Sequence, residues 1–223
     1  MLAVSAVVCS LLLARDAKKE GLPPDFAFDF IFWMAVFGLI GARIFYILMN
    51  LDFFIENPLE IIMIQRGGLA WQGGLIAGTI AGAYLIKRKH LPFLKTLDLV
   101  TPYIALGQAI GRLGCFLNGC CYGQHAAFGG IYFPVHDDTL YPTQLYDAVG
   151  LFIIFFILKY FYRKPHAPGQ VFVLYLMLAP ALRFVIEFLR ADHDVLYLGL
   201  SLYQWICLAF IAAAFILKYK FRQ

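Results

Sequence analysis

The chain has 223 residues, of which 62% are hydrophobic, 17% are aromatic and only 14% are charged, and its mean hydropathy is +0.76. Because soluble domains carry about 25% charged residues, this composition excludes an ordinary soluble domain and predicts an all-α integral membrane protein. The formal net charge is +4. The basic runs contain no motif that would read bases, so nucleic acid is not expected as a partner.

Seven apolar stretches bounded by charged or polar residues predict seven helices. The first has about 13 residues, against the ~20 that span a bilayer, so we expect a short first helix that is either truncated at its start or incomplete on its outer side. A long irregular connection is expected over Gly111–Gln144, and the absence of an internal repeat or linker favours a single transmembrane domain over residues 1–223. The predicted helices are Leu2–Ala14, Phe28–Met49, Leu69–Ile86, Leu97–Ile110, Leu145–Tyr160, Val171–Leu189 and Leu198–Leu217.

Thirteen of the 18 Lys and Arg residues form four clusters, which follow the first, third, fifth and seventh predicted helices. Cytoplasmic loops of membrane proteins are enriched in Lys and Arg. The pattern therefore predicts about seven transmembrane helices with the N-terminus outside and the C-terminus inside. The clusters are Arg15-Lys18-Lys19, Lys87-Arg88-Lys89-Lys95, Lys159-Arg163-Lys164 and Lys218-Lys220-Arg222.

The five remaining basic residues are all arginines inside or beside apolar stretches: Arg43, Arg66, Arg112, Arg183 and Arg190. An ionised side chain at membrane depth costs at least ~2.5–3.5 kcal/mol on insertion scales, so such residues indicate a function. The planar guanidinium matches phosphate and carboxylate groups. We therefore expect this protein to handle an anion at the membrane.

Arg183 and Glu187 are four residues apart, so they are predicted to pair on one helical face, with Arg190 on the same stripe. One interpretation is an ion pair that satisfies itself inside the membrane. However, Arg112, Arg183 and Arg190 outnumber Glu187, which is the only deep carboxylate that the sequence indicates. We expect a phosphate to supply the missing negative charge.

Three cysteines, Cys115, Cys120 and Cys121, lie close together in the chain. They form no CxxC motif and have no nearby His pair, so no metal site is predicted. They are expected on the oxidising side of the membrane, where a disulfide among them is possible. A membrane thiol oxidoreductase that uses Cys120 and Cys121 remains an alternative function.

The segment Gly111–Gly123 resembles the signature of the prolipoprotein diacylglyceryl transferase family, Gly-Arg-x-Gly-Asn-Phe-x-Asn-x-Glu-x-x-Gly. Cys115 and Cys120 stand where the family has Asn and Glu. The matching residues are Gly111, Arg112, Gly114, Phe116, Asn118 and Gly123.

Three further segments are similar to the family. Gly73-Gly74-Leu75-Ile76 resembles its His-Gly-Gly-Leu-Ile segment, with Gln72 in place of His. Tyr141-Pro142-Thr143-Gln144-Leu145-Tyr146-Asp147 resembles its Pro-Ser-Gln-Leu-Tyr-Glu segment. Arg183-Phe184-Val185-Ile186-Glu187-Phe188-Leu189-Arg190 resembles its Arg-Phe-x-x-Glu-Phe-x-Arg helix.

The resemblance implies a multi-pass protein of the bacterial cytoplasmic (inner) membrane, with seven transmembrane helices and an active site open to the outer leaflet. It also implies transfer of the diacylglyceryl group of phosphatidylglycerol to the lipobox cysteine of a prolipoprotein signal peptide. A thioether forms, glycerol phosphate is released, and no cofactor or metal is expected. Membrane lipids are further partners. Because Gln72 cannot accept a proton usefully, Glu187, a phosphate oxygen or water is left as the base.

The resemblance implies two sets of site residues. The catalytic set is Arg112, Arg183 and Glu187. The substrate-binding set is Arg112, Asn118, Gly111, Gly114, Gln72, Gly73, Gln144, Tyr146 and Arg190. Besides the oxidoreductase, the open alternatives are a catalytically divergent membrane paralogue and an anion-binding protein.

Overall fold

A computed structural model describes residues 1–23, 25–63, 67–191 and 195–220. Arg66 and Arg222, named above among the basic residues, lie outside the described residues. The chain is mostly helical and forms two compact units, Ser10–Phe93 on one hand and Met1–Cys9 with Leu94–Gln223 on the other. The single transmembrane domain stays a prediction.

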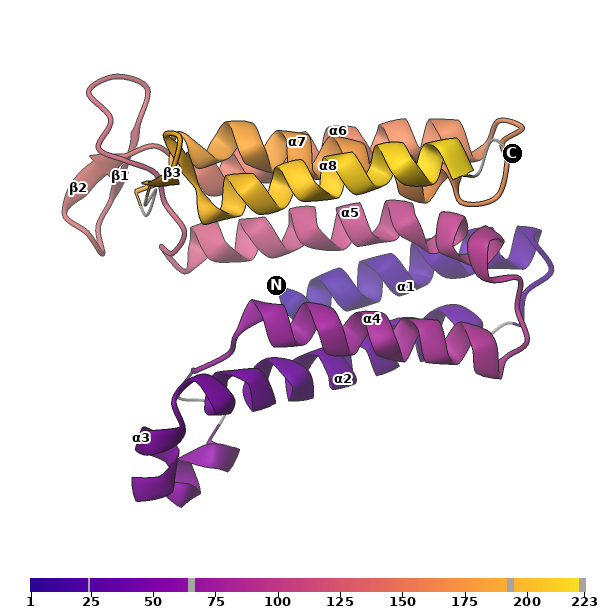
Figure 1. The fold of residues 1–223 in the computed structure, drawn as a ribbon, viewed down its shortest axis with the longest axis horizontal. Helices are drawn as coiled ribbons and strands as arrows, with labels where there is room; N and C mark the ends of the chain where they lie inside the picture. The colour runs from indigo at the N-terminus through magenta and orange to yellow at the C-terminus, as the bar shows by residue number, and fades with distance from the viewer. Residues whose placement is uncertain (24, 64–66, 192–194, 221–223) are drawn as a thin grey trace. The chain divides into compact units, whose positions relative to one another are not determined.

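All seven predicted helices are present, with shifted ends (Figure 1). The first helix continues to Lys19 instead of ending at Ala14, because its charged last turns are made of good helix formers. The long helices are α1 (Leu2–Lys19), α2 (Phe26–Met49), α4 (Trp71–Arg88), α5 (Phe93–Leu117), α6 (Thr143–Tyr162), α7 (Gln170–Glu187) and α8 (Leu202–Lys220). Between α2 and α4 lie the short helix α3 (Leu51–Glu56) and the 3₁₀ helix η1 (Pro58–Ile62).

Two predictions about irregular regions were wrong. Helix α5 runs to Leu117, so Gly111 and Gly114 lie inside a helix and not in a loop. A glycine in a helix interior costs only about 1 kcal/mol relative to alanine, which the apolar packing of α5 overcomes. The all-α prediction also missed two antiparallel hairpins, β1 (Ile131–Phe133) with β2 (Asp138–Leu140), and β3 (Val195–Tyr197) with β4 (Leu200–Ser201).

Because the second hairpin precedes it, the last helix begins at Leu202 and not at Leu198. Leu198 and Gly199 form its two-residue turn, and both have a positive φ, 51° and 76°. Two-residue hairpin turns favour this backbone conformation because its twist matches that of the strands.

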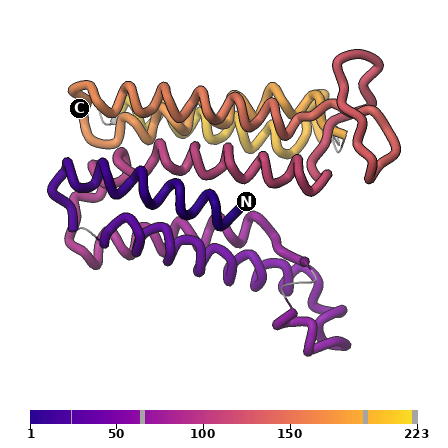
Figure 2. The backbone as a smooth tube through the Cα atoms, turned by 180° about the vertical axis from the view of Figure 1, so that it is seen from behind, coloured from indigo at the N-terminus to yellow at the C-terminus, as the bar shows by residue number. Residues whose placement is uncertain are grey.

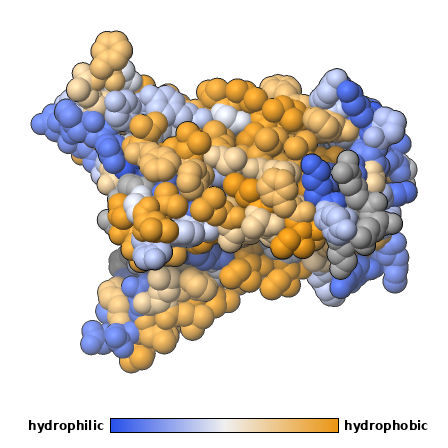
Figure 3. Space-filling view, turned by 45° about the horizontal axis from the view of Figure 1, so that its top comes forward, coloured by the Kyte–Doolittle hydropathy of each residue, from blue (hydrophilic) through white to orange (hydrophobic). Residues whose placement is uncertain are grey.

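Four helices, α2, α6, α7 and α8, are long and apolar enough to cross a membrane. Only 11–33% of the residues in their most apolar windows are buried inside the protein, so most residues of these windows are partly or fully exposed. Figure 3 shows hydrophobic side chains over the helices and hydrophilic ones near the helix ends. The chain is therefore a helical membrane protein, whereas seven crossings and the orientation stay predictions.

In the unit Ser10–Phe93, α2 and α4 pack closely through glycines. A Cβ atom on Gly78 would lie 3.6 Å from the Met34 carbonyl oxygen, and one on Gly74 would lie 3.2 Å from the Gly38 carbonyl oxygen. Such close backbone approach is possible only with small residues at the interface.

Arg43 crosslinks the loop that follows α2 in the same unit. Its Nη1 donates to the carbonyls of Gly67 and Gly68 at 2.7 and 2.9 Å, and its Nε donates to the Ile61 carbonyl at 3.1 Å. Its Nη2 donates to the Glu60 carbonyl. This buried arginine is satisfied by backbone carbonyls.

In the other unit, α5, α6, α7 and α8 lie side by side (Figure 2). The two hairpins lie at the end where α5 and α7 finish and α6 and α8 begin (Figure 1). At the other end, Asp98 of α5 accepts hydrogen bonds from the backbone N–H groups of Gly169 and Phe172, at 2.6 and 2.9 Å. This contact holds the start of α7 against α5.

Candidate functional site

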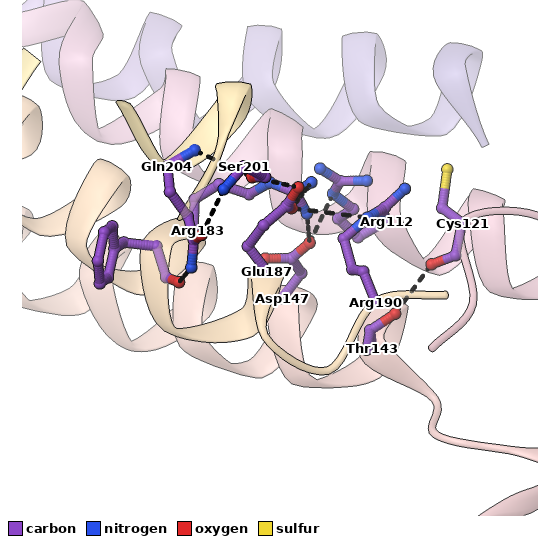
Figure 4. A network of polar contacts seen from close by, with 10 residues as sticks. Arg112, Cys121, Thr143, Asp147, Arg183, Glu187, Arg190, Ser201 and Gln204 are labelled. Carbon is purple, nitrogen blue, oxygen red and sulfur yellow. Dashed lines mark hydrogen bonds and ion pairs between the residues drawn. The ribbon is translucent and has the colours of Figure 1, made fainter. Parts of the chain in front are cut away.

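A network of arginines and carboxylates lies at the hairpin end of the helices α5–α8 (Figure 4). Arg112 comes from the last turns of α5, Asp147 from the beginning of α6, and Glu187 from the last turn of α7. Antiparallel neighbours bring the end of one helix next to the start of the following one. Residues that are far apart in the sequence therefore meet here.

Asp147 joins two of the helices. Its Oδ2 lies 3.1 Å from Arg112 Nε and 3.6 Å from Arg183 Nη1. The carboxylate therefore holds both guanidinium groups at one point of the site.

Glu187 holds the other side of the network. Its Oε2 lies 2.5 Å from Arg183 Nη2 and 3.7 Å from Arg190 Nε, and its Oε1 accepts a hydrogen bond from the Ser201 hydroxyl at 3.2 Å. The predicted pairing of Arg183 with Glu187 is confirmed. Both carboxylate oxygens of Glu187 have protein partners.

The carboxylates are more deeply buried than the arginines. The side chains of Glu187 and Asp147 are 1% and 5% exposed, whereas those of Arg112 and Arg183 are 28% and 22% exposed. Buried charges need partners, which explains the pairing. The three arginines and two carboxylates leave one positive charge in excess, and the accessible side of the network is cationic.

The sequence interpretation missed Asp147, and Glu187 is not the only deep carboxylate. Asp147 lies in the second turn of α6, beyond the first turn in which the helix dipole ordinarily explains an acidic residue. Its position in the Tyr141–Asp147 segment, where the resembling pattern ends in Glu, was the signal that could have identified it.

Arg190 is not on the predicted helical stripe, because α7 ends at Glu187. It reaches Glu187 from the turn that follows the helix. Its backbone forms an isolated bridge with Gly123, and the Gln124 N–H donates to the Leu189 carbonyl at 2.8 Å. The end of α7 is thereby joined to the loop of residues 118–124 that follows α5, which we call the signature loop.

The signature loop begins with a glycine turn that ends α5. The Cys120 N–H donates to the Cys115 carbonyl and the Gly119 N–H to the Phe116 carbonyl, both at 3.1 Å, and Gly119 has φ +65°. These are the two bonds and the left-handed glycine of a Schellman motif. The turn brings Cys120 back beside Cys115.

Cys121 also has a left-handed backbone, with φ 63°. Its carbonyl accepts a hydrogen bond from the Thr143 hydroxyl at 2.9 Å, and Figure 4 shows its side chain next to Arg112 and Arg190. The hydrogen bond from the Cys115 thiol and the positive charges of Arg190 and Arg112 lower the pKa of the Cys121 thiol to about 5.

Gln144 connects the loop to α6. Its Nε2 donates to the Cys120 carbonyl at 2.7 Å, and the residue is 1% exposed. Its Oε1 is buried without a hydrogen-bond partner among the described residues, as is Arg183 Nη1. The Arg183 Nη1 atom does lie 3.6 Å from Asp147 Oδ2, in an ion pair that is too long for a hydrogen bond.

The other predicted binding residues of this unit surround the network less closely. Asn118 is exposed at the end of α5, and Tyr146 is 38% exposed on α6. A Cβ atom on Gly111 would meet nothing within 4 Å, whereas one on Gly114 would lie 2.8 Å from Met1 Cβ. Gly111 therefore has open space beside it, and Gly114 is needed for packing.

Gln72 and Gly73 belong to the other unit, in the first turn of α4. Gly73 is buried against Gly41 and Phe45 of α2, which gives it a packing role. The structure therefore groups Arg112, Gln144, Arg183, Glu187 and Arg190 in one unit, and the binding roles of Gln72 and Gly73 stay predictions.

Apolar helices around a buried arginine–carboxylate network define a membrane protein with a polar internal site. The family model of prolipoprotein diacylglyceryl transferase matches residues 1–219, and the chain belongs to this family. The resemblance noted in the signature loop is thereby confirmed.

Several relatives carry the name phosphatidylglycerol–prolipoprotein diacylglyceryl transferase. The protein of Finegoldia magna is 35% identical over 225 residues, which cover 100% of this chain and 90% of the relative. The protein of Clostridium tetani is 35% identical, over 93% of this chain and 86% of the relative. That of Staphylococcus aureus is 35% identical, over 95% and 79%.

Proposed function

We propose that this chain transfers the diacylglyceryl group of phosphatidylglycerol to the thiol of a prolipoprotein cysteine and releases glycerol phosphate. Membership of the family and the names of the relatives support the reaction and both substrates. The acceptor is the lipobox cysteine of the signal peptide. The enzyme is a transferase of the bacterial membrane.

One observation carries the assignment of the site: accessible guanidinium groups are held by more deeply buried carboxylates, with one positive charge in excess. A phosphodiester carries one negative charge and would neutralise this excess. Bidentate hydrogen bonds from Arg to phosphate are strong and directional. We assign Arg112, Arg183 and Arg190 to the phosphate of phosphatidylglycerol.

Two polar atoms match the rest of the head group. Arg183 Nη1 is a buried donor and Gln144 Oε1 a buried acceptor, both without a hydrogen-bond partner in the described parts of the chain. The donor suits a phosphate oxygen, and the acceptor suits a hydroxyl of the glycerol head group. Leaving such groups unsatisfied costs about 1–3 kcal/mol each, which a ligand would recover.

The arginines would act most strongly as the bond to phosphate breaks. Negative charge then accumulates on the leaving oxygen, and fixed positive groups stabilise that charge without reorganisation. Glu187 has both oxygens engaged, by Arg183 and Ser201. Of the roles left open by the sequence, these contacts favour positioning of Arg183 over proton abstraction.

We further propose a seven-span topology in one transmembrane domain, with the N-terminus outside, the C-terminus inside and the site open to the outer leaflet of the cytoplasmic (inner) membrane. The four basic clusters support it through the positive-inside bias. A reporter inserted at Asp137-Asp138 should behave as external and one fused after the C-terminus as cytoplasmic. Cytoplasmic labelling of the first would contradict this topology.

The function is tested with the purified full chain, labelled phosphatidylglycerol and a lipobox peptide. Mass spectrometry should detect a thioether-linked diacylglyceryl peptide together with glycerol phosphate. A peptide with Ser in place of Cys should remain unmodified, because it lacks the thiol. Absence of the thioether product from a folded, membrane-inserted protein would contradict the proposal.

A further inference from the structure

Three thiols lie together where α5 ends and the signature loop begins. The sulfurs of Cys115, Cys120 and Cys121 are all within 4.8 Å of one another, and each residue is half-buried. All three are free cysteines. The sequence spacing predicted no metal site, but the folded loop brings the three sulfurs together.

The backbone around these sulfurs is held firmly. The Schellman turn fixes Cys120 against Cys115, and the carbonyls of Cys120 and Cys121 accept hydrogen bonds from Gln144 and Thr143 of α6. Outer contacts of this kind orient the ligands of metal sites. The backbone that carries the three sulfurs is therefore fixed by hydrogen bonds.

The spacing suits a zinc ion. With Zn–S bonds of about 2.3 Å, tetrahedral geometry places sulfurs about 3.8 Å apart. The observed upper limit of 4.8 Å is only slightly wider, so small side-chain rotations would close it. Three protein ligands leave the fourth zinc position open, as in catalytic sites.

The proposed reaction needs a deprotonated thiol, and a free Cys has a pKa near 8.5. Gln72 is not a base, and Glu187 is engaged by Arg183 and Ser201. A thiol that binds zinc is deprotonated outright. A three-thiolate zinc site is anionic, which the positive field of Arg112 and Arg190 at the Cys121 sulfur favours.

We propose that Cys115, Cys120 and Cys121 bind one Zn²⁺ and that the thiol of the incoming peptide occupies the fourth position. The proposal rests on the proposed function for its substrate. It assigns activation of the acceptor thiol to this loop, beside the arginines that hold the phosphate.

The step conserves atoms and charge. On binding to zinc, the peptide thiol releases its proton to solvent. Its sulfur then attacks the diacylglyceryl carbon bonded to the phosphate oxygen, so a C–S bond forms and the C–O bond breaks. The electron pair of that C–O bond passes to the phosphate oxygen, and glycerol phosphate leaves with one more negative charge. Zinc keeps its +2 state throughout.

Metal binding is tested first, on the purified full chain. Elemental analysis should give one zinc per chain, and replacement by Co²⁺ should produce thiolate-to-cobalt charge-transfer absorption. Cys115→Ser, Cys120→Ser and Cys121→Ser should each weaken zinc binding by more than about 100-fold, because each removes a ligand. Cys9→Ser is the matched control, since Cys9 is a buried thiol of α1 that donates to the Tyr103 carbonyl. It should bind zinc normally.

The role of the fourth position is tested with the cobalt form. A lipobox peptide should change the charge-transfer absorption, whereas its Ser analogue should not. Chelation should lower thioether formation by at least about tenfold, and added Zn²⁺ should restore it.

The outcomes separate this proposal from the proposed function. Zinc binding through the three cysteines without transfer by any form would defeat the function and leave the metal site. Full transfer after complete zinc removal would overturn the zinc role and leave the function. Equal zinc content in all four variants, or a disulfide among the three cysteines in the active protein, would overturn the metal site.

Discussion

Arg43 and the arginines of the network all lie in or beside apolar helices, but different groups hold them. Arg43 is 7% exposed, whereas the side chains of Arg112 and Arg183 are 28% and 22% exposed. Arg43 donates to four backbone carbonyls, of Glu60, Ile61, Gly67 and Gly68. Arg112 and Arg183 contact carboxylates, and Arg183 Nη1 has no hydrogen-bond partner in the described chain. One arginine closes a loop, and the others are positioned by carboxylates.

The difference shows why an arginine in an apolar stretch does not by itself indicate a ligand. Backbone carbonyls can satisfy a guanidinium completely, since each accepts a hydrogen bond and brings no net charge. Carboxylates fix its direction and neutralise part of its charge. A cluster with more arginines than carboxylates keeps a net positive charge and can bind an anion. An arginine surrounded by backbone carbonyls has its donors occupied by the protein itself.

The largest effect on transfer is expected from changing the geometry of the network arginines. Arg112→Lys and Arg183→Lys keep the charge but lose the planar fork, so transfer should fall about 10²–10³-fold while the protein still inserts. Arg163→Lys, an exposed change at the end of α6, is the control and should be neutral. Near-normal transfer by both network variants would remove the phosphate role.

Replacing Arg43, the arginine of the unit Ser10–Phe93, should lower stability and not transfer. Arg43→Met leaves buried carbonyls without donors, and we expect a loss of about 2–3 kcal/mol in the free energy of unfolding. Thermal unfolding in detergent measures it. Transfer per folded molecule should stay within about threefold, because in this view Arg43 binds no substrate. A large loss of transfer without a loss of stability would show that Arg43, like the network arginines, contributes to substrate binding or catalysis.

The partner carboxylate separates positioning from base catalysis. Glu187→Gln keeps the shape of the side chain but removes the charge that holds Arg183, so transfer should fall about tenfold or somewhat more. The whole pH–rate curve should move down without a change of shape. Loss of the acid limb of that curve would instead identify Glu187 as a base.

The smallest effects should come from two glycines beside Arg43. Gly67 and Gly68 have φ +88° and +77°, so Ala at either should cost about 1 kcal/mol in backbone strain. A Cβ atom on Gly68 would also lie 2.5 Å from Tyr46 Cε1 and 2.7 Å from Arg43 Nη1, whereas one on Gly67 would meet none of the described residues within 4 Å. Gly68→Ala should therefore lower the unfolding midpoint further than Gly67→Ala. Equal shifts would mean that the Tyr46 and Arg43 side chains can move aside.

Much of the fold could be predicted because a helix that spans a membrane needs a long run of apolar residues. The Arg183–Glu187 pair could be predicted as well, because it depends only on spacing within one helix. The hairpin at Leu198-Gly199 could not, since its strands are two or three residues long and blend into the apolar run of α8. Local apolarity does not distinguish a short strand from the first turn of a helix.

The partly missed features all depend on contacts between distant segments. The ion pairs of Asp147 depend on how α6 lies against α5 and α7, because its partners come from those helices. The grouping of Cys115 with Cys120 depends on a single left-handed glycine, Gly119, which reverses the chain. Sequence rules for metal sites look for closely spaced ligand pairs such as CxxC. The five-residue separation of Cys115 and Cys120 therefore did not predict a site.

The backbone bridge between Gly123 and Arg190 has a consequence for how this chain can vary. A Cβ atom on Gly123 would lie 2.5 Å from the Leu189 carbonyl oxygen and 2.7 Å from Tyr141 Cβ, so the two segments meet with no spare room. Inserting or deleting one residue between Cys121 and Gly123 would therefore shift either the thiols or Arg190 out of place. We expect substitutions in this stretch to be tolerated far more readily than changes in its length.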